Sequence, residues 1–259
     1  MKKLLVLLAA VCAVSVLAES IVLKTIDFET SEGYQPGDLL NQNGWYGIYS
    51  GADRQIVVND STAAPSGAQY VTTADGKSCN SAVRFDISAG YQPNNKLRIS
   101  WSACALEGGD TFYVKIHNLG ESMNGSNPRT FDTEIAEITI SQSGWCNCSV
   151  CKEDKTGTTD IKKLLAAPFV FHDFSLTIDP KDHTIKEYTI DDEVVFDGSA
   201  VYYYKNDRSS GYAGGSDIVD GVRIMNKGSF DNFKVEMVPE PAAFALIALL
   251  GLFFARKQR

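Results

Sequence analysis

Apolar and polar residues alternate with a period of two along most of the chain, which is the pattern of strands that bury one face. Gly, Asn, Asp and Pro separate these segments, as expected for turns. Only residues 160–167, DIKKLLAA, favour a helix, and it would be two turns long. About a dozen short strands at this spacing predict an all-β fold, a two-sheet jelly-roll sandwich. The segments concerned are residues 21–28, 54–58, 69–73, 81–87, 96–103, 111–118, 134–141, 170–178, 184–190, 194–196, 219–225 and 230–238.

The N-terminal residues have the layout of a secretory signal peptide. Two lysines precede an apolar run, and Val16 and Ala18 occupy the small-residue positions before a cleavage site. The run is shorter than the ~20 residues of a spanning helix, which favours a cleaved signal helix over an uncleaved anchor. We therefore expect signal peptidase to remove residues 1–18, so that the mature body begins at Glu19 and works outside the cytoplasm.

The C-terminal segment ends in a short apolar stretch and a basic cluster. Residues 242–255 carry no charge and predict a hydrophobic helix about 21 Å long, against a hydrocarbon core of ~30 Å. A buried core helix is the alternative, but here the apolar residues would cover every face. The Lys and Arg residues that follow would stay cytoplasmic and act as a basic membrane stop. These residues are Arg256, Lys257 and Arg259.

Pro239, Glu240 and Pro241, followed by that stretch and the basic cluster, resemble the PEP-CTERM sorting signal of exported bacterial proteins. The resemblance covers residues 239–259, with a mild departure where Gln258 interrupts the basic cluster. It implies that an exosortase, a membrane-embedded transpeptidase-like enzyme, recognises Pro-Glu-Pro and processes the tail. The three motif residues would be substrate and not catalyst. The precursor would be membrane-tethered, and the mature domain periplasmic, cell-surface or extracellular.

Residues 19–238 form the expected domain. Without the five basic residues and the one acidic residue of the end segments, 19 basic and 31 acidic residues remain, a net charge of about −12. Nucleic acid is excluded as a partner on this ground, because phosphate binding needs a basic face. No internal repeat, Pro- or Ser-rich linker or long charge block divides the segment, and its length suffices for one core.

Residues 174–198 predict a strand, an Asp-Pro turn, a strand, an Asp-Asp turn and a short strand. This meander resembles that of concanavalin A-like and laminin G-like sandwiches. Residues 28–47 and 218–235 resemble the first and last strands of such domains, so the resemblance covers most of residues 21–237. It implies a concanavalin A-like fold and says less about function.

The segment FDTEIAEITI holds the candidate catalytic residues Asp132, Glu134 and Glu137. Laminarinase-type glucanases carry E-x-D-x-x-E on one strand of this sandwich, and the three acids have the corresponding spacing with the acid types rearranged. Retaining hydrolysis requires two carboxyl groups ~5 Å apart. Asp132 and Glu134 would share a strand face, whereas Glu137 would need a β-bulge to join them.

Two observations weigh against this enzyme hypothesis. No Trp lies close to the acids in sequence as a sugar platform, and an exposed acidic strand face explains the same pattern. No G-x-S-x-G elbow supports acyl transfer either. We therefore expect a protein that is not an enzyme, with a secreted glucanase-like glycoside hydrolase as the alternative.

Five cysteines would remain after signal cleavage, and in an oxidising compartment they are disulfide candidates. Cys79 and Cys104 lie beside neighbouring predicted strands and could form a bridge, whereas Cys146 and Cys148 are too close in sequence to pair easily. The WCNCSVC run lacks a nearby fourth ligand for zinc, and the three histidines have no metal-ligand spacing, so we expect no metal. The odd thiol could bond another molecule. The five are Cys79, Cys104, Cys146, Cys148 and Cys151.

Tyrosines in a polar loop before residue 219 are the candidate glycan contacts, because aromatic rings stack on sugars while Asn and Asp bond the hydroxyl groups. Such loops also suit Ca²⁺, although no ligand set stands out. The sequence thus predicts an exported, non-enzymatic surface or matrix protein that binds a polysaccharide or another surface component. A purely structural surface protein is the further alternative. The tyrosines are Tyr202, Tyr203, Tyr204 and Tyr212.

Overall fold

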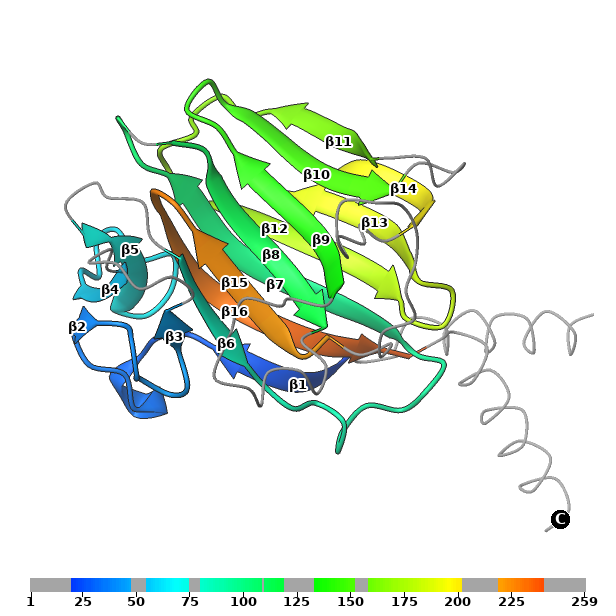
Figure 1. The fold of residues 1–259 in the computed structure, drawn as a ribbon, viewed down its shortest axis with the longest axis horizontal. Helices are drawn as coiled ribbons and strands as arrows, with labels where there is room; N and C mark the ends of the chain where they lie inside the picture. The colour runs from blue at the N-terminus through cyan, green and yellow to red at the C-terminus, as the bar shows by residue number, and fades with distance from the viewer. Residues whose placement is uncertain are drawn as a thin grey trace, which may run out of the picture.

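The computed structural model describes residues 20–47, 55–74, 80–108, 110–118, 133–151, 158–201 and 219–239. Two antiparallel β-sheets pack face to face in this part of the chain (Figure 1). The expected all-β, two-sheet sandwich is therefore confirmed. The expected helices at the two ends lie outside the described residues. Within the described ranges, no helix has the length and apolarity that a membrane crossing requires.

Sheet A has nine strands and contains both the first and the last strand of the sandwich. The first part of β16 pairs with β5 and its second part with β1, so one edge of β16 serves two partners. The strand order is β14 (Glu193–Val201), β13 (Thr184–Ile190), β12 (His172–Asp179), β7 (Lys96–Ala105), β16 (Gly228–Val238), β5 (Gln69–Thr73), β4 (Gln55–Asn59) and β2 (Gly37–Asp38), with β1 (Ile21–Ile26) beside β16.

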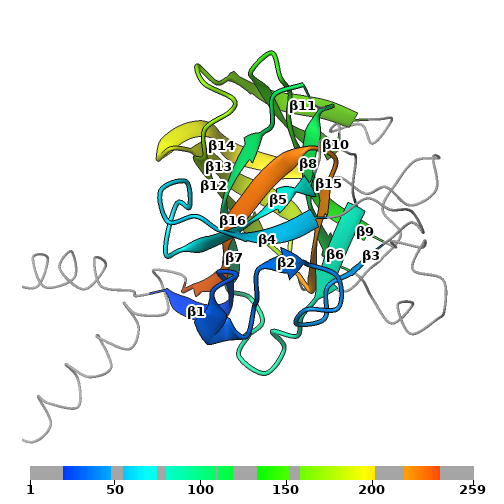
Figure 2. The same ribbon diagram turned by 90° about the vertical axis from the view of Figure 1, so that its left-hand side faces the viewer.

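Sheet B has seven strands. Consecutive strands β15 and β16 lie in different sheets, and Figure 2 shows them in separate layers. The order is β11 (Thr158–Leu164), β10 (Trp145–Cys151), β9 (Thr133–Ile140), β8 (Phe112–Asn118), β15 (Gly221–Met225), β6 (Asn80–Arg84) and β3 (Tyr46–Gly47).

The helix expected over residues 160–167 is wrong, because residues 158–164 form β11. All seven residues of β11 pair with β10, from Trp145 opposite Leu164 to Cys151 opposite Thr158. The ladder satisfies the backbone donors and acceptors along one edge of β11, and this tertiary pairing outweighs the helix propensity of Lys and Leu, since propensity is a weak determinant beside tertiary context.

The core lies between the sheets and consists of the inward residues of both. Trp101 of β7 and Phe174 of β12 stack with ring centroids 5.6 Å apart, and both are almost fully buried. Phe28 contacts Trp45 and Phe230 in the same core. Burial of each such side chain stabilises the fold by about 2–3 kcal/mol, so the two-sheet packing holds the strand register in place.

A β-bulge in β9 interrupts its pairing with β8. Ile116 pairs with Ala136, whereas the next residue, His117, pairs with Glu134, so Ile135 is the extra residue. Ile135 and Ala136 are consecutive and both buried, which a regular strand does not allow on one face. The bulge therefore changes which positions of β9 face outward.

Candidate functional site

One cross-strand row of mostly polar residues crosses the outer face of sheet B. Val114 and Ile116 of β8 and Val222 of β15 point into the core, so the residues between them point away from it. The aligned residues, from β3 to β11, are Tyr46, Ala82, Arg223, Lys115, Glu137, Ser149 and Asp160.

The cations of this row are buried although they lie on the outer face. Lys115 is 5% exposed and Arg223 is 6% exposed. The Lys115 ammonium group forms an ion pair with the Glu137 carboxylate and lies 5.8 Å from the centroid of the Tyr113 ring. Arg223 donates from Nε to Oδ1 of Asn80 over 2.7 Å. These polar groups are thus held in fixed positions.

Tyr46 provides a neutral hydroxyl group at the β3 end of the row. Burial raises the pKa of Tyr46 to about 12, while the charges of Arg223 and Arg84 act to lower it and that of Asp220 to raise it. A guanidinium nitrogen of Arg84 lies 3.7 Å from Oδ2 of Asp220 at the border of the same face. Because the phenol stays protonated at neutral pH, it can both donate and accept a hydrogen bond.

The β9 bulge brings two of the three candidate catalytic positions to the same face. Glu134 pairs with His117 and Glu137 with Lys115, and these partners are two residues apart on β8. The bulge that the sequence spacing requires for such a pair is therefore present. Asp132 lies outside the described residues, and the Glu137 carboxylate is engaged by Lys115.

Trp145 lies on the same outer face, at the β10–β11 edge of sheet B. It is 47% exposed, whereas Trp45 and Trp101, the other tryptophans of the chain, are each 1% exposed. Trp145 is not among the residues predicted from the sequence, because the cysteines of WCNCSVC suggested disulfide or metal chemistry for that segment. The alternation in that segment was the available signal, since Cys146 and Cys148 are buried in the core and Trp145 faces outward.

The structure contradicts the expected disulfides at three of the cysteines. Cys104, Cys146 and Cys148 carry free thiols, so the disulfides expected at these three positions are not formed. Cys146 and Cys148 point into the core between the sheets, whereas Cys104 lies beside Ser229 on the outer face of sheet A. Burial raises the pKa of Cys104 to about 11 and that of Cys146 to about 12, so both stay protonated. Cys79 and the Cys151 side chain lie outside what the structure describes.

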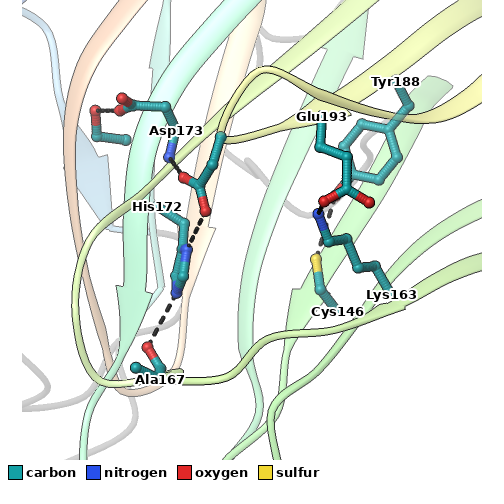
Figure 3. Close-up of polar contacts among 9 residues, drawn as sticks. Cys146, Lys163, Ala167, His172, Asp173, Tyr188 and Glu193 are labelled. Carbon is teal, nitrogen blue, oxygen red and sulfur yellow. Dashed lines mark hydrogen bonds and ion pairs between the residues drawn. The ribbon is translucent and has the colours of Figure 1, made fainter.

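A second polar cluster lies where β12 begins, and Figure 3 shows it. His172 contacts Oδ2 of Asp191 through Nδ1 over 2.6 Å and the carbonyl oxygen of Ala167 through Nε2 over 3.0 Å. Asp191 also accepts the backbone N–H of Asp173 over 3.0 Å. Because Nε2 contacts a carbonyl and not a nucleophile, this Asp–His pair joins three chain segments and does not form a catalytic triad.

Nearby, the same view shows how β10 and β11 contact sheet A. The Cys146 thiol lies 3.2 Å from the Tyr188 hydroxyl group in the core. Lys163 of β11 donates to Glu193 of β14 over 2.7 Å. These contacts join the outer strands of the two sheets.

Metal-binding clusters are absent from the described ranges, where no group of three or more His, Cys, Asp or Glu residues could hold an ion. Asp231 is the most isolated acid there, since it is fully buried and neither carboxylate oxygen has a well-formed hydrogen bond. Burial raises the pKa of Asp231 to about 8; the backbone N–H groups of Asn232 and Ser66 lower it and the charges of Asp27 and Glu29 raise it. Asp231 thus supplies a buried carboxyl group, and the described ranges contain no Ca²⁺ ligand set.

The remaining predicted residues lie mostly outside the described ranges. Pro239 of the sorting motif is described; it is buried and follows β16 directly. The positions outside are the tyrosines Tyr202, Tyr203, Tyr204 and Tyr212, the motif residues Glu240 and Pro241, and the basic residues Arg256, Lys257 and Arg259.

No protein-family model matches the chain, and no curated protein matches it. Among solved structures, the laminarinase from Rhodothermus marinus has 11% identity and a TM-score of 0.49, covering 86% of this chain and 100% of that one. The globular domain of T. cruzi calreticulin has 11% identity and a TM-score of 0.48, covering 83% and 91%. A Bacillus subtilis protein of unknown function with a galectin-like fold has 7% identity and a TM-score of 0.46, covering 86% and 99%. At these values the likenesses carry no argument about activity or ligand.

Proposed function

We propose that this chain is an exported, non-enzymatic β-sandwich protein that binds a polysaccharide on the outer face of sheet B. The observation that carries the binding proposal is the row of buried polar side chains on that face. A solvated sheet face ordinarily carries mobile side chains, whereas here Lys115 and Arg223 are buried and held by partners. These two cations are too deeply buried to contact much of a ligand, so they act by fixing the face, and the contacts would come from the more exposed members of the row, Tyr46, Ser149 and Asp160. A face whose groups are already fixed in position loses little conformational entropy on binding, which favours a ligand that hydrogen-bonds at many points.

Export rests on the two ends of the sequence. The signal-peptide pattern of residues 1–18 and the Pro-Glu-Pro motif at 239–241 support processing by signal peptidase and by an exosortase. Because Pro239 follows β16 directly, residues 242–255 would hold the sandwich close to the membrane until the tail is processed. The mature protein would then serve at the cell surface or in the extracellular matrix. A role for Ca²⁺ stays a prediction.

The binding proposal is tested on immobilised polysaccharides with the purified full chain and two variants. We expect retention of the wild type on at least one polysaccharide, and weaker retention of Arg223→Gln. Lys234→Gln is the matched control, because Lys234 lies on the outer face of sheet A beside Glu236. Absence of retention on every glycan would instead favour the purely structural surface protein.

The β9 bulge favours one second candidate function, the glucanase-like hydrolase. It places positions 134 and 137 on one face, as a pair of catalytic carboxyl groups requires. If wild type hydrolyses a β-glucan and Glu134→Gln abolishes hydrolysis while binding remains, the enzyme hypothesis replaces ours. If the wild type hydrolyses no glycan of a panel, the enzyme hypothesis is wrong.

A further inference from the structure

We infer that Trp145 and Leu164 form a stacking platform for a neutral saccharide chain at the β10–β11 edge of sheet B. This inference rests on the proposed function and adds to it the site of ring stacking and the chemical class of the ligand. The platform is defined as these two residues.

The platform is a cross-strand pair on adjacent strands. Trp145 and Leu164 are directly opposite each other in the β10–β11 register, and they are 47% and 57% exposed. Side chains opposite each other on one face of an antiparallel pair lie ~5 Å apart, so the two form one continuous apolar surface. Both side chains keep about half of their apolar surface in water, and a ligand that covers this surface is favoured by the hydrophobic effect.

Polar groups follow the platform along the same two strands. The next outward pair is Asn147 and Lys162, and the one after it is Ser149 and Asp160, where the Ser149 hydroxyl donates to Asp160 over 2.8 Å. Each pair is two residues further along, about 7 Å. The outer face of the ribbon thus changes from an apolar surface to amide, ammonium, hydroxyl and carboxylate groups within a short distance.

Asn147 gives an independent indication of a missing partner. Its Oδ1 atom is buried and has no hydrogen bond to any residue that the structure describes. A buried acceptor without a partner destabilises the fold, and native proteins leave few of them. A ligand hydroxyl group that bonds Asn147 once its amide turns outward would remove this cost.

This sequence of groups suits a pyranose chain better than other ligands. A pyranose ring with equatorial hydroxyl groups has an apolar C–H face that stacks on an indole ring, and its edge carries hydroxyl groups that bond amides and carboxylates. A lipid chain would leave Asn147, Lys162 and Asp160 without hydrogen-bond partners from the ligand. The net charge of about −12 on residues 19–238 disfavours an anionic chain.

The three tryptophans make a direct test available, because only Trp145 is exposed. Acrylamide quenching of tryptophan fluorescence in the full chain should come mainly from Trp145, and Trp145→Phe should remove that accessible component. A neutral oligosaccharide that binds should reduce the quenching of Trp145 in the wild type. The probes are cellohexaose, laminarihexaose, xylohexaose and maltohexaose. Polygalacturonate should have no such effect.

Affinity for the bound oligosaccharide supplies the second readout. We expect Trp145→Ala to weaken binding at least tenfold and Leu164→Ala to weaken it severalfold. Val194→Ala is the matched control, because Val194 is 53% exposed but belongs to β14 of sheet A. Its affinity should equal that of the wild type. Circular dichroism identifies any variant that fails to fold, and for such a variant the wild-type quenching experiment decides.

The outcomes separate this inference from the proposed function. If a polysaccharide is retained but Trp145 stays accessible to acrylamide and Trp145→Ala binds equally well, the platform is wrong and the proposed function stands. If no saccharide is retained at all, both fail. Protection of Trp145 from acrylamide by polygalacturonate would overturn the assigned ligand class. So would protection by neutral phosphatidylcholine vesicles if no oligosaccharide protects it.

Discussion

Lys115 and Glu137 form an ion pair across adjacent strands β8 and β9, on the outer face of sheet B and largely out of contact with water. Because the pair is buried, each charge depends on the other for its stabilisation. Lys115→Met should leave the Glu137 carboxylate unpaired and lower the free energy of unfolding by about 3 kcal/mol. The double variant Lys115→Met/Glu137→Gln should recover most of that loss. Urea denaturation measures both, and equal losses in the two variants would contradict the pairing.

Asp231 should make the stability of the protein fall as pH rises. Burial raises its pKa to about 8, so between pH ~4 and ~8 the folded protein keeps a proton that the unfolded chain releases. This group then lowers the free energy of unfolding by up to about 1.4 kcal/mol per pH unit in that window, and no further above it. Asp231→Asn cannot ionise, so its stability relative to wild type should increase from pH 5 to pH 8.

Thermal unfolding of both proteins in EDTA buffers from pH 5 to pH 9 tests the Asp231 prediction. EDTA keeps divalent cations from the buried carboxylate, so that only protons titrate it. A constant difference between variant and wild type at every pH would show that Asp231 is ionised in the fold throughout this range.

Gly144 should be required for the position of Trp145. Its φ is +85°, and a Cβ at this position would lie 2.6 Å from the carbonyl oxygen of Leu165, which is backbone and cannot move aside cheaply. Gly144→Ala should therefore lower the stability by at least about 1 kcal/mol. It should also weaken saccharide binding, because Gly144 ends the turn before β10. Gly108→Ala is the control, since the φ of Gly108 is +69° but no atom of the described residues lies within 4 Å of a Cβ there.

The sorting prediction is tested on the mature protein from a host that makes an exosortase. Mass spectrometry should find a C-terminus near Pro239 and an N-terminus at Glu19. Replacing Glu240 by Ala should leave the precursor unprocessed, because the motif would be the substrate of the exosortase. An intact Arg259 on surface-exposed wild-type protein would contradict sorting.

Most of the fold could be predicted from the sequence, because alternating segments with turn residues between them are a local signal. Strands β12 to β14 follow the predicted meander closely, and Asp191 and Asp192 form its turn with φ values of 51° and 61°. Strands β10 and β11 were missed. The cysteines of β10 obscure its alternation, and β11 contains Lys and Leu residues that favour helix until pairing with β10 decides the conformation.

The candidate site could be predicted only in part, because it depends on register between strands far apart in sequence. The spacing of Glu134 and Glu137 indicated that a bulge would be needed, and the structure has that bulge. No local pattern places Arg223 beside Lys115, since the two residues are 108 positions apart and meet only through the pairing of β15 with β8. The role of the Cys146 and Cys148 side chains as core residues was likewise hidden, because oxidising conditions suggested disulfides.

If the chain is exported as we propose, the free thiols of Cys146 and Cys148 set a condition on the order of folding and oxidation. Both sulfur atoms are shielded by the packed sheets in the native state, but an unfolded chain exposes them to any oxidant. A chain that crosses a membrane unfolded and meets a disulfide-forming catalyst would become trapped with mispaired sulfurs unless the sheets close first. In an exported chain the sheets would therefore have to close faster than the thiols are oxidised, and slowly folding variants should accumulate as cross-linked species.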